Sequence, residues 1–523
     1  MRLFFRAGCL FRKSPLFHFF SKPMSHVTAR QSASDRSRVL FGVISASSVG
    51  TLIEWYDFYI FGSLSAIIST QFFPKDNPTA ALLSALAVFA AGFIVRPFGA
   101  LVFGRLGDIV GRKYTFLVTL VLMGGSTFLI GLIPGYETWG MVSPLLVLLL
   151  RLIQGLALGG EYGGAATYVA EYAPEGRRGY FTSWIQTTAT LGLFVSLAVI
   201  VATRKAVGTS DFEAWGWRIP FLASILLVGV SIFIRLRMEE SPLFSKLKSE
   251  GKVSKNPLAE SFGKRENLKM VLLALLGATA GQGVVWYTGQ FYALSFIQKV
   301  GHVDFEQSSE IVAIALAFAT GGFIFFGWLS DKIGRKSIML AGMLLGVLTY
   351  RPIYTQLYQL SDTSLKTEET SLREIRTTEV PGKPTIRTTV HYYTDGTQVL
   401  ETAGGSGEVK KTLVHGSRGY WLTVLLIWIQ VIYVTMVYGP IAAFLVELFP
   451  TRIRYTSMSL PYHIGNGVFG GLTPFLAVAL VEKATRSGSE QAYLAGLWYP
   501  ILVAAVSFVI GLVYLSSKPK PQE

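Results

Sequence analysis

One loop sequence occurs twice in this chain, each time between two long apolar runs. The first copy, at 104–113, reads GRLGDIVGRK, and the second, at 327–336, reads GWLSDKIGRK. A second pair of segments repeats in the same order: EYAPEGRR at 171–178 and ELFPTRIR at 447–454 share a carboxylate, a proline and an arginine. Because duplicated membrane segments are typical of secondary transporters, these repeats predict two related membrane halves.

The composition places these halves in lipid. Hydrophobic residues make up 51% of the 523 residues and charged residues only 15%, a balance that a water-soluble domain of this length could not hide in its core. A helix crosses a bilayer with roughly 20 apolar residues, and the apolar runs give about twelve such helices. They are expected near 39–70, 79–104, 114–133, 142–168, 180–203, 218–236, 268–298, 308–329, 337–358, 419–446, 456–481 and 493–516.

The net charge of +15 does not indicate nucleic-acid binding, because the Lys and Arg residues lie in short segments beside the apolar runs. These basic clusters fall in alternate loops, at 105–113, 177–178, 235–269, 332–336 and 452–454. By the positive-inside rule, this alternation predicts a multi-pass protein of the plasma (inner) membrane with both termini in the cytoplasm.

Metal, redox and catalytic chemistry have no support in the sequence. Cys9 is the only cysteine, which excludes an internal disulfide, and no Cys/His cluster has the spacing of a zinc or iron–sulfur site. No pairing of a nucleophile with a base is evident. We therefore expect no metal, no cofactor, no catalytic residue and no enzymatic activity.

Two segments fall outside the pattern of apolar runs. Residues 1–38 are basic and rich in Phe, which is typical of a transit peptide, or they precede a translation start at Met24. The second pair of repeats is spaced more widely than the first, which places an insertion at 362–418. Within it, 386–400 predicts an external β-hairpin around an Asp395-Gly396 turn. Its role is a lid, a partner-binding element or a tolerated surface insertion.

The first apolar run carries two carboxylates, Glu54 and Asp57, three residues apart on one helical face. Ionisable groups at this depth are costly and mark function. Desolvation and a like-charged neighbour both favour the protonated form, so one of the two could bind and release a proton near neutral pH. In the alternative interpretation, Asp57 pairs with an intramembrane arginine, for which Arg96 and Arg151 are available. Either arginine could instead bind a carboxylate group of the substrate.

Other candidates for the transport site follow the same logic. Glu161, a third acid within a helix, is expected to serve in coupling or in packing. The apolar runs of the second half offer mainly neutral polar and aromatic side chains, so we expect charge handling in the first half and hydrogen bonding in the second. His463 is interpreted as a hydrogen-bonded packing residue rather than a proton relay. The full set of candidate proton and substrate residues is Glu54, Asp57, Arg96, Arg151, Gln154, Glu161, Gln282, Tyr287 and Gln290.

The repeated segments predict a latch on the cytoplasmic side. The glycines allow a tight approach, each Asp can accept hydrogen bonds from the N-terminus of a neighbouring helix, and each Arg can pair with an opposing acid. Rupture of these contacts would exchange inward and outward openings. The candidate gating residues are Gly104, Asp108, Gly111, Arg112, Glu171, Arg178, Gly327, Asp331, Gly334, Arg335, Glu447 and Arg454.

The chain resembles the major facilitator superfamily, and within it the metabolite:proton symporters that include proline/betaine, α-ketoglutarate, shikimate and citrate permeases. The repeated loops and the run Arg151 to Gly155 are similar to superfamily motifs. Narrower signals are EWYDF at 54–58, RPFG at 96–99, GGEY at 159–162, EYAP at 171–174, WGWRIPF at 215–221 and FPTRIRY at 449–455. The likeness spans nearly all of residues 40–515.

This resemblance implies an all-α membrane protein of twelve transmembrane helices in two pseudo-symmetric six-helix bundles, the major facilitator fold. It also implies proton-driven uptake in which Glu54, Asp57, Arg151 and Glu161 take part. The expected organisation is a cytoplasmic leader at 1–38, bundles at 39–237 and 268–516, a cytoplasmic linker at 238–267, an external insertion at 362–418 and a cytoplasmic tail at 517–523. The insertion and the seventh run, WYTGQFY at 286–292, depart from the shorter members and from the betaine permeases, so the substrate does not carry over.

The function expected from these observations is proton-coupled symport of a small organic solute, either an organic acid or a zwitterionic compatible solute, by alternating access. The partners would be that substrate, protons and membrane lipid, with no nucleic acid, and the protein would act as a monomer. Two alternatives stay open: a facilitative sugar or metabolite uniporter, and a solute-sensing membrane receptor.

Overall fold

The computed structural model describes residues 33–236, 238–378, 386–403 and 409–516. Most of the expected N-terminal leader, 1–32, and the expected tail, 517–523, lie outside the described residues.

Eight principal helices build the N-terminal half. Asn77 caps one of them by accepting a hydrogen bond from the N–H of Ala80, with Pro78 in the first turn. The next helix begins at Arg96-Pro97, where proline ends the preceding one, so that the second membrane crossing is broken at Val95. The helices are α3 Ala33–Ser63, α4 Ser65–Phe72, α5 Pro78–Ile94, α6 Arg96–Ile109, α7 Arg112–Leu132, α9 Val142–Tyr172, α10 Arg178–Val207 and α12 Arg218–Leu236, with short turns at α8 Tyr136–Trp139, α11 Thr209–Asp211 and η1 Phe212–Gly216.

The C-terminal half follows the linker helix α13, Pro242–Ser249, and contains several π-helical turns. Its elements are η2 Ala259–Gly263, α14 Arg265–Ala274, η3 Leu275–Thr279, α15 Ala280–Tyr287, η4 Thr288–Tyr292, α16 Ala293–Lys299, α17 Phe305–Ile333, α18 Arg335–Ser361, α19 Ser417–Tyr438, α20 Ile441–Leu448, η7 Thr451–Ile453, α21 Arg454–Ile464, η8 Gly465–Gly470, α22 Thr473–Arg486, η9 Ala492–Leu497 and α23 Trp498–Tyr514.

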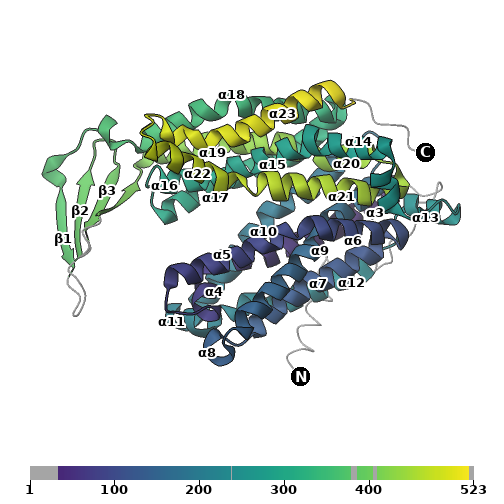
Figure 1. The fold of residues 1–523 in the computed structure, drawn as a ribbon, viewed down its shortest axis with the longest axis horizontal. Helices are drawn as coiled ribbons and strands as arrows, with labels where there is room; N and C mark the ends of the chain where they lie inside the picture. The colour runs from purple at the N-terminus through teal and green to yellow at the C-terminus, as the bar shows by residue number, and fades with distance from the viewer. Residues whose placement is uncertain (1–32, 237, 379–385, 404–408, 517–523) are drawn as a thin grey trace.

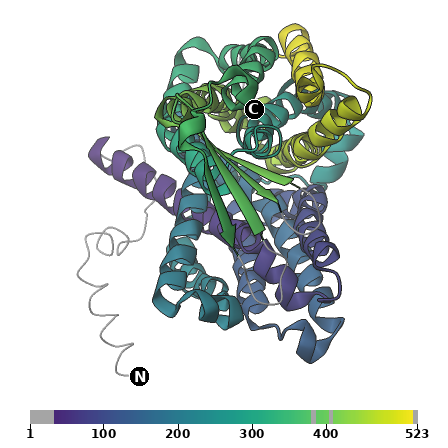
Figure 2. The ribbon, with the colours of Figure 1, turned by 90° about the vertical axis from the view of Figure 1, so that its left-hand side faces the viewer.

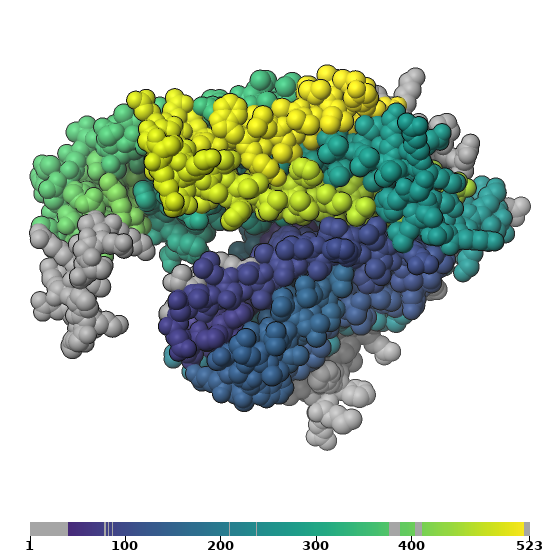
Figure 3. All heavy atoms as spheres, in the orientation of Figure 1, coloured from purple at the N-terminus to yellow at the C-terminus, as the bar shows by residue number. Residues whose placement is uncertain are grey.

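The predicted twelve membrane crossings are present. Eleven helical segments of the described chain are long and apolar enough to span a bilayer, and α3 with α4 makes the remaining crossing. The two halves lie against each other at the end that carries α13 and diverge toward the opposite end (Figure 1). The space-filling view shows an open hollow between them on the diverging side (Figure 3).

A four-stranded antiparallel sheet stands at the diverging end, attached to the C-terminal half (Figure 1). Its strands are β1 Glu374–Thr378, β2 Ile386–Tyr392, β3 Gln398–Ala403 and β4 Val409–Val414, in the order β1-β2-β3-β4. The predicted hairpin is β2 and β3, with Tyr392 opposite Gln398 and Gly396 at φ 80° in the turn. The prediction missed the outer strands β1 and β4, and it missed two short 3₁₀ turns before them, η5 Thr363–Leu365 and η6 Thr370–Leu372.

Backbone hydrogen bonds tie this sheet to the loop between α16 and α17. The N–H of Leu413 donates to the carbonyl of His302 at 2.7 Å, and the N–H of Asp304 donates to the carbonyl of Leu413 at 2.8 Å. The side chain of Gln307 bonds to the backbone of His415 on both its N–H and its carbonyl. Viewed from the diverging end, the strands run from the C-terminal half across the front of the junction between the halves (Figure 2).

Glycine brings α9 against the second membrane crossing and so fixes where Arg96 lies. A Cβ on Gly155 would overlap the carbonyl of Gly92, and a Cβ on Gly159 would overlap the carbonyl of Arg96. Small residues of this kind let membrane helices approach at backbone distance. The start of α6 is therefore held directly beside α9, near the centre of the molecule.

Candidate functional site

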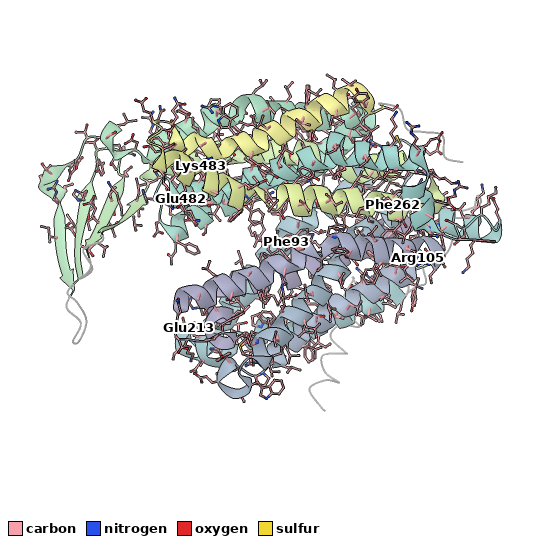
Figure 4. The ribbon with its side chains drawn as sticks, in the orientation of Figure 1. Phe93, Arg105, Glu213, Phe262, Glu482 and Lys483 are labelled. Atoms are coloured by element: carbon pink, nitrogen blue, oxygen red, sulfur yellow. The ribbon has the colours of Figure 1, made fainter. Side chains whose placement is uncertain are left out.

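A central pocket lies where the two halves converge. The N-terminal half lines it with side chains from α3, α6 and α9, and the C-terminal half with side chains from α15, α19, α21 and η8. Phe93, near the end of α5, lies close to the point where the halves meet, whereas Glu213 and Glu482 lie far apart on the two diverging arms (Figure 4). The pocket is thus shared between the halves, as a binding site that opens to alternate sides requires.

Arg96 presents an unpaired guanidinium to this pocket. The residue is 6% exposed, and its charge lies 4.0 Å from the ring centre of Phe93 and 4.7 Å from that of Phe58. Its Nε and Nη2 atoms have no hydrogen-bond partner, and no carboxylate of the described residues lies within ion-pair distance. A buried guanidinium without a partner is costly, so this site favours an anion that can accept two hydrogen bonds.

Glu54 lines the same pocket and belongs to a buried charge cluster behind it. Glu161 forms an ion pair with Arg235 and accepts a hydrogen bond from Thr119 Oγ1 at 2.7 Å. Glu54 lies near Glu161, and Arg235 lies near both carboxyl groups. Neither oxygen of Glu54 receives a hydrogen bond from the described residues. A proton on Glu54 would supply the missing donor between the two acids.

Arg235 was not predicted as a site residue, because in the sequence it falls in the basic stretch at the start of the linker. The residue occupies the last turn of α12, and its guanidinium points inward. It stacks on the ring of Phe116 at 3.6 Å and passes so close to α3 that a Cβ on Gly50 would overlap it. In a sequence, an arginine at the end of an apolar run is interpreted as a loop residue. The burial of Arg235 becomes evident only when α12 is seen packed against its neighbouring helices.

Asp57 points away from the pocket and into the N-terminal half. Its Oδ1 accepts a hydrogen bond from Ser224 Oγ of α12 at 2.7 Å, and its other oxygen faces Gly124 of α7. No arginine or lysine of the described chain pairs with it, so the reading of Asp57 as the partner of an intramembrane arginine is wrong. The two carboxylates of α3 therefore face different surroundings.

Arg151 and Gln154 also lie outside the pocket lining. Arg151 Nη1 donates to Gln154 Oε1 at 2.6 Å, and Gln154 Nε2 donates to Thr127 Oγ1 at 2.7 Å. The guanidinium of Arg151 rests on the rings of Phe61 at 4.4 Å and Phe89 at 5.0 Å. These contacts connect α9 to its neighbours within the N-terminal half rather than to the space between the halves.

Aromatic rings form most of the remaining pocket wall. Tyr162 of α9 stacks on Tyr462 of α21 with ring centres 3.6 Å apart, and Tyr462 shares a hydrogen bond of 2.6 Å with the hydroxyl of Tyr438. Trp55 of α3 faces Trp286 of α15 at 6.4 Å. Of these aromatic residues, only Tyr287 was predicted as a site residue. Because Trp and Tyr also serve as interface anchors, their position in the pocket does not follow from residue type.

Among the polar residues of the C-terminal half, some line the pocket and others lie behind it. Gln282 and Asn466 exchange two hydrogen bonds of 3.0 Å, which leaves Asn466 in the pocket lining and Gln282 behind it. Gln290 lies on η4, outside the lining. His463 lines the pocket, and its hydrogen bond with the backbone of Gly159 agrees with its interpretation as a hydrogen-bonded packing residue, while its Nε2 has no partner among the described residues.

The first copy of the repeated loop closes the end of the molecule that carries the linker. Asp108 accepts hydrogen bonds from the N–H groups of Tyr455 at 3.3 Å and Thr456 at 2.8 Å, in the first turn of α21. The N-terminal loop thus binds the N-terminus of a helix in the other half, where the helix dipole favours a negative charge.

A buried cluster of alternating charges surrounds this contact. Glu171 lies 3.0 Å from Arg454 and 3.6 Å from Arg112, and Arg112 lies 3.3 Å from Asp108. All four side chains are at most 1% exposed. From the linker, Glu240 accepts hydrogen bonds from the backbone N–H of Arg112, and burial raises the pKa of Glu240. This contact of the linker was not predicted from the sequence.

The second copy of the loop makes the symmetric contact. Asp331 accepts hydrogen bonds from the N–H groups of Gly179 at 2.9 Å and Tyr180 at 2.7 Å, at the start of α10. Arg335 pairs with Asp331 at 2.5 Å and with Glu447 at 2.9 Å. Gly111 and Gly334, at φ 137° and 97°, allow the turns between the helices on either side of each loop.

The remaining predicted gating residues make other kinds of contact. Gly104 packs against the backbone of Thr456, and Gly327 packs against Gly179, so both allow the halves to touch. Arg178 donates from Nε to the carbonyl of Ala170 at 3.2 Å. Glu447 is held by Arg335 within its own half, so the ion pair that crosses between the halves at this level joins Glu171 to Arg454.

Comparisons with known proteins agree with this architecture. The Sugar (and other) transporter family matches residues 43–271. The α-ketoglutarate permease of Escherichia coli (strain K12) is 31% identical over 498 residues, which cover 94% of this chain and 97% of the permease. The citrate-proton symporter of Klebsiella pneumoniae is 30% identical over 477 residues, covering 91% of each chain. The proline/betaine transporter of E. coli (strain K12) is 29% identical over 494 residues, covering 91% of this chain and 84% of that protein.

The fold is also found in solved structures. The proton:xylose symporter XylE bound to 6-bromo-6-deoxy-D-glucose has a TM-score of 0.63 and 16% identity, and the match covers 92% of this chain and 97% of that one. This likeness confirms the predicted twelve-helix architecture in two pseudo-symmetric bundles, and the relatives confirm that the chain is a membrane transporter rather than an enzyme. The chain belongs to the major facilitator superfamily, among the metabolite transporters that include the α-ketoglutarate permease and the proline/betaine transporter of E. coli.

Proposed function

We propose that this protein is a proton-coupled symporter that carries a small organic solute with a carboxylate group. The observation that carries the proposal is the unpaired guanidinium of Arg96 in the central pocket, beside the carboxyl group of Glu54. The arginine supplies the anion site and the acid supplies the proton site. The citrate-proton symporter among the relatives is named for the same combination of cargo and ion.

Glu54 is the proton carrier in this proposal. Charged together, Glu54 and Glu161 repel each other while Arg235 already pairs with Glu161. A proton on Glu54 removes the repulsion and adds a hydrogen bond. The proton-free and protonated states therefore differ by one charge, at Glu54 next to the substrate. Asp57, Arg151 and Gln154 hold the helices of the N-terminal half in register rather than touching the substrate.

The two loop contacts act as the gate. In the structure they are closed at the linker end, and the hollow opens at the sheet end (Figure 3). Because the linker end carries the basic clusters, we assign it to the cytoplasm, with both termini on that side, and place the protein in the plasma membrane. The structure then represents the outward-facing state. Since one chain supplies both halves of the pocket, we expect a monomer to be sufficient.

Reconstituted liposomes provide the test. A pH gradient, acidic outside, is expected to drive uphill accumulation of a labelled carboxylate by the wild-type protein, and collapse of the gradient with a protonophore should abolish it. Glu54→Gln should abolish accumulation but retain exchange of labelled for unlabelled substrate. A uniporter would equilibrate the substrate without accumulating it, and a receptor would bind it without flux, so either result would refute symport.

A further inference from the structure

We propose that the substrate is a monocarboxylate with a planar apolar body, and not a di- or tricarboxylate or a quaternary ammonium compound. This inference rests on the proposed binding of a carboxylate at Arg96 and narrows the class of cargo. It differs from the cargo for which the α-ketoglutarate and citrate relatives are named.

The first argument is the number of cations in the pocket. Among the described residues that line it, Arg96 is the one lysine or arginine, and Glu54 is the one acid. Arg235 is paired with Glu161. Arg151 lies outside the pocket lining, where its Nη1 donates to Gln154 while its Nε and Nη2 have no partner among the described residues. One guanidinium pairs with one carboxylate in a bidentate fashion. A second carboxylate on the substrate would be buried without a partner, which is costly.

The second argument is the charge of the loaded pocket. With Glu54 protonated, the positive charge of Arg96 and the negative charge of a monocarboxylate sum to zero. A dicarboxylate leaves one uncompensated negative charge. A zwitterionic betaine leaves one positive charge unless Glu54 gives up its proton, in which case the cargo displaces the coupling ion. An occluded state in low dielectric therefore favours the monoanion.

The third argument is the shape and chemistry of the walls. Trp55, Trp286, Tyr287 and Tyr438 line the pocket, and the stacked pair of Tyr162 and Tyr462 closes one side. Ring surfaces of this kind stack favourably on a flat apolar or conjugated body. A carboxylate at Arg96 with a flat body lying against the facing rings of Trp55 and Trp286 would contact both halves at once. The substrate would then bridge the two halves that must close around it.

Direct binding to the purified wild-type protein tests the proposal without any gradient. Titration calorimetry and quenching of tryptophan fluorescence would compare benzoate with benzamide, which lacks the charge, and with isophthalate, which adds a second carboxylate. Benzoate, 4-hydroxybenzoate or cinnamate should bind saturably at millimolar concentration or below. Benzamide and isophthalate should bind at least tenfold more weakly, and cyclohexanecarboxylate several-fold more weakly, than the best planar monocarboxylate.

Two pairs of variants assign the binding to this pocket. Arg96→Gln should weaken benzoate binding at least tenfold, whereas Arg204→Gln, at a side chain that is 53% exposed, should leave it unchanged. Trp286→Leu should weaken it several-fold, whereas Trp421→Leu, at a residue that is 52% exposed on α19, should not. If Arg96→Gln does not fold, Arg96→Lys retains the charge and should still lose affinity, because it cannot form the bidentate pair.

Three results would overturn the proposal: α-ketoglutarate, citrate, isophthalate or glycine betaine binding as tightly as the best planar monocarboxylate, no saturable binding by any planar monocarboxylate, or unchanged binding in both arginine variants. These results are separate from a failure of symport. If benzoate binds as expected but a pH gradient does not drive its uptake, the proton coupling is wrong and the substrate class stands. If a pH gradient drives uptake of citrate instead, the coupling stands and the substrate class is wrong.

Discussion

Neutralising Glu171 should open the gate at the linker end. In the structure Glu171 is the ion-pair partner of Arg454 at 3.0 Å and the second partner of Arg112 at 3.6 Å. In Glu171→Gln, Arg112 keeps Asp108 at 3.3 Å, but Arg454 loses its carboxylate while it remains buried. Breaking a buried ion pair by removing one partner costs roughly 3–5 kcal/mol. The glutamine oxygen can still accept a hydrogen bond, so we expect a smaller loss than this range, about 2–3 kcal/mol.

A loss of this size shifts the balance between closed and open gates by a factor of about 30 to 150, at roughly 1.4 kcal/mol for each factor of ten. Distances between spin labels would measure the shift in a Cys9→Ser background. One pair replaces Glu213 and Glu482, which lie on the two diverging arms (Figure 4), and should move closer together. The other replaces Arg105 and Lys264, exposed residues near the linker end, and should move apart.

Glu175→Gln is the matched control, since this exposed glutamate lies in the turn that follows α9 and forms no ion pair with another described residue. It should leave both distance distributions unchanged. If Glu171→Gln also leaves them unchanged, the buried cluster does not hold the gate, and the closure must come from the contacts of Asp108 and Asp331 with the helix N-termini alone.

Three further outcomes are expected. Asp57→Asn, which can still accept the hydrogen bond from Ser224, should reduce proton-driven accumulation much less than Glu54→Gln; equal losses in flux assays would give Asp57 a proton-carrying role. Uptake of a monocarboxylate with one proton should be electroneutral, so a valinomycin-induced potassium potential should not change its initial rate; a rate that follows the potential would contradict one proton per monoanion. Burial lowers the pKa of His415, which follows β4, from 6.5 to about 4. As the pH falls, His415 is therefore protonated in the unfolded sheet before it is protonated in the folded sheet. The sheet should therefore be fully stable above pH 6.5 and lose about 2 kcal/mol by pH 5, seen as faster amide exchange, and His415→Gln should flatten this dependence.

Sequence was most informative where the signal is local. The apolar runs and the charged loops between them mark the membrane crossings, and Glu54 and Arg96 stand out because ionisable residues interrupt apolar runs. The hydrogen bonds of Asp108 and Asp331 to helix N-termini follow from the repeated loop, because an acid at a tight helical turn needs donors nearby. Each of these features depends on a few neighbouring residues.

The direction in which a side chain points and the residue with which it pairs were harder to predict from the sequence. Residues three apart on a helix differ in direction by about 60°, and that angle is enough to place Glu54 in the pocket and Asp57 against α12. The ion pair between Glu161 and Arg235 joins residues that are distant in sequence, so it depends on how α9 and α12 pack. The outer strands of the sheet lack a clear alternation: β1 reads EIRTT and β4 reads VKKTLV.

The attachment of the sheet has a mechanical consequence. Because hydrogen bonds to His302, Asp304 and Gln307 tie it to the loop before α17 and to the first turn of that helix, it moves with the C-terminal half as a lever arm. A small rotation of that half about the linker end is amplified at the sheet, since displacement grows with distance from the pivot (Figure 1). An antibody fragment clamped between this arm and the other half would stall turnover from outside the cavity, and a fluorophore on the arm would report each cycle.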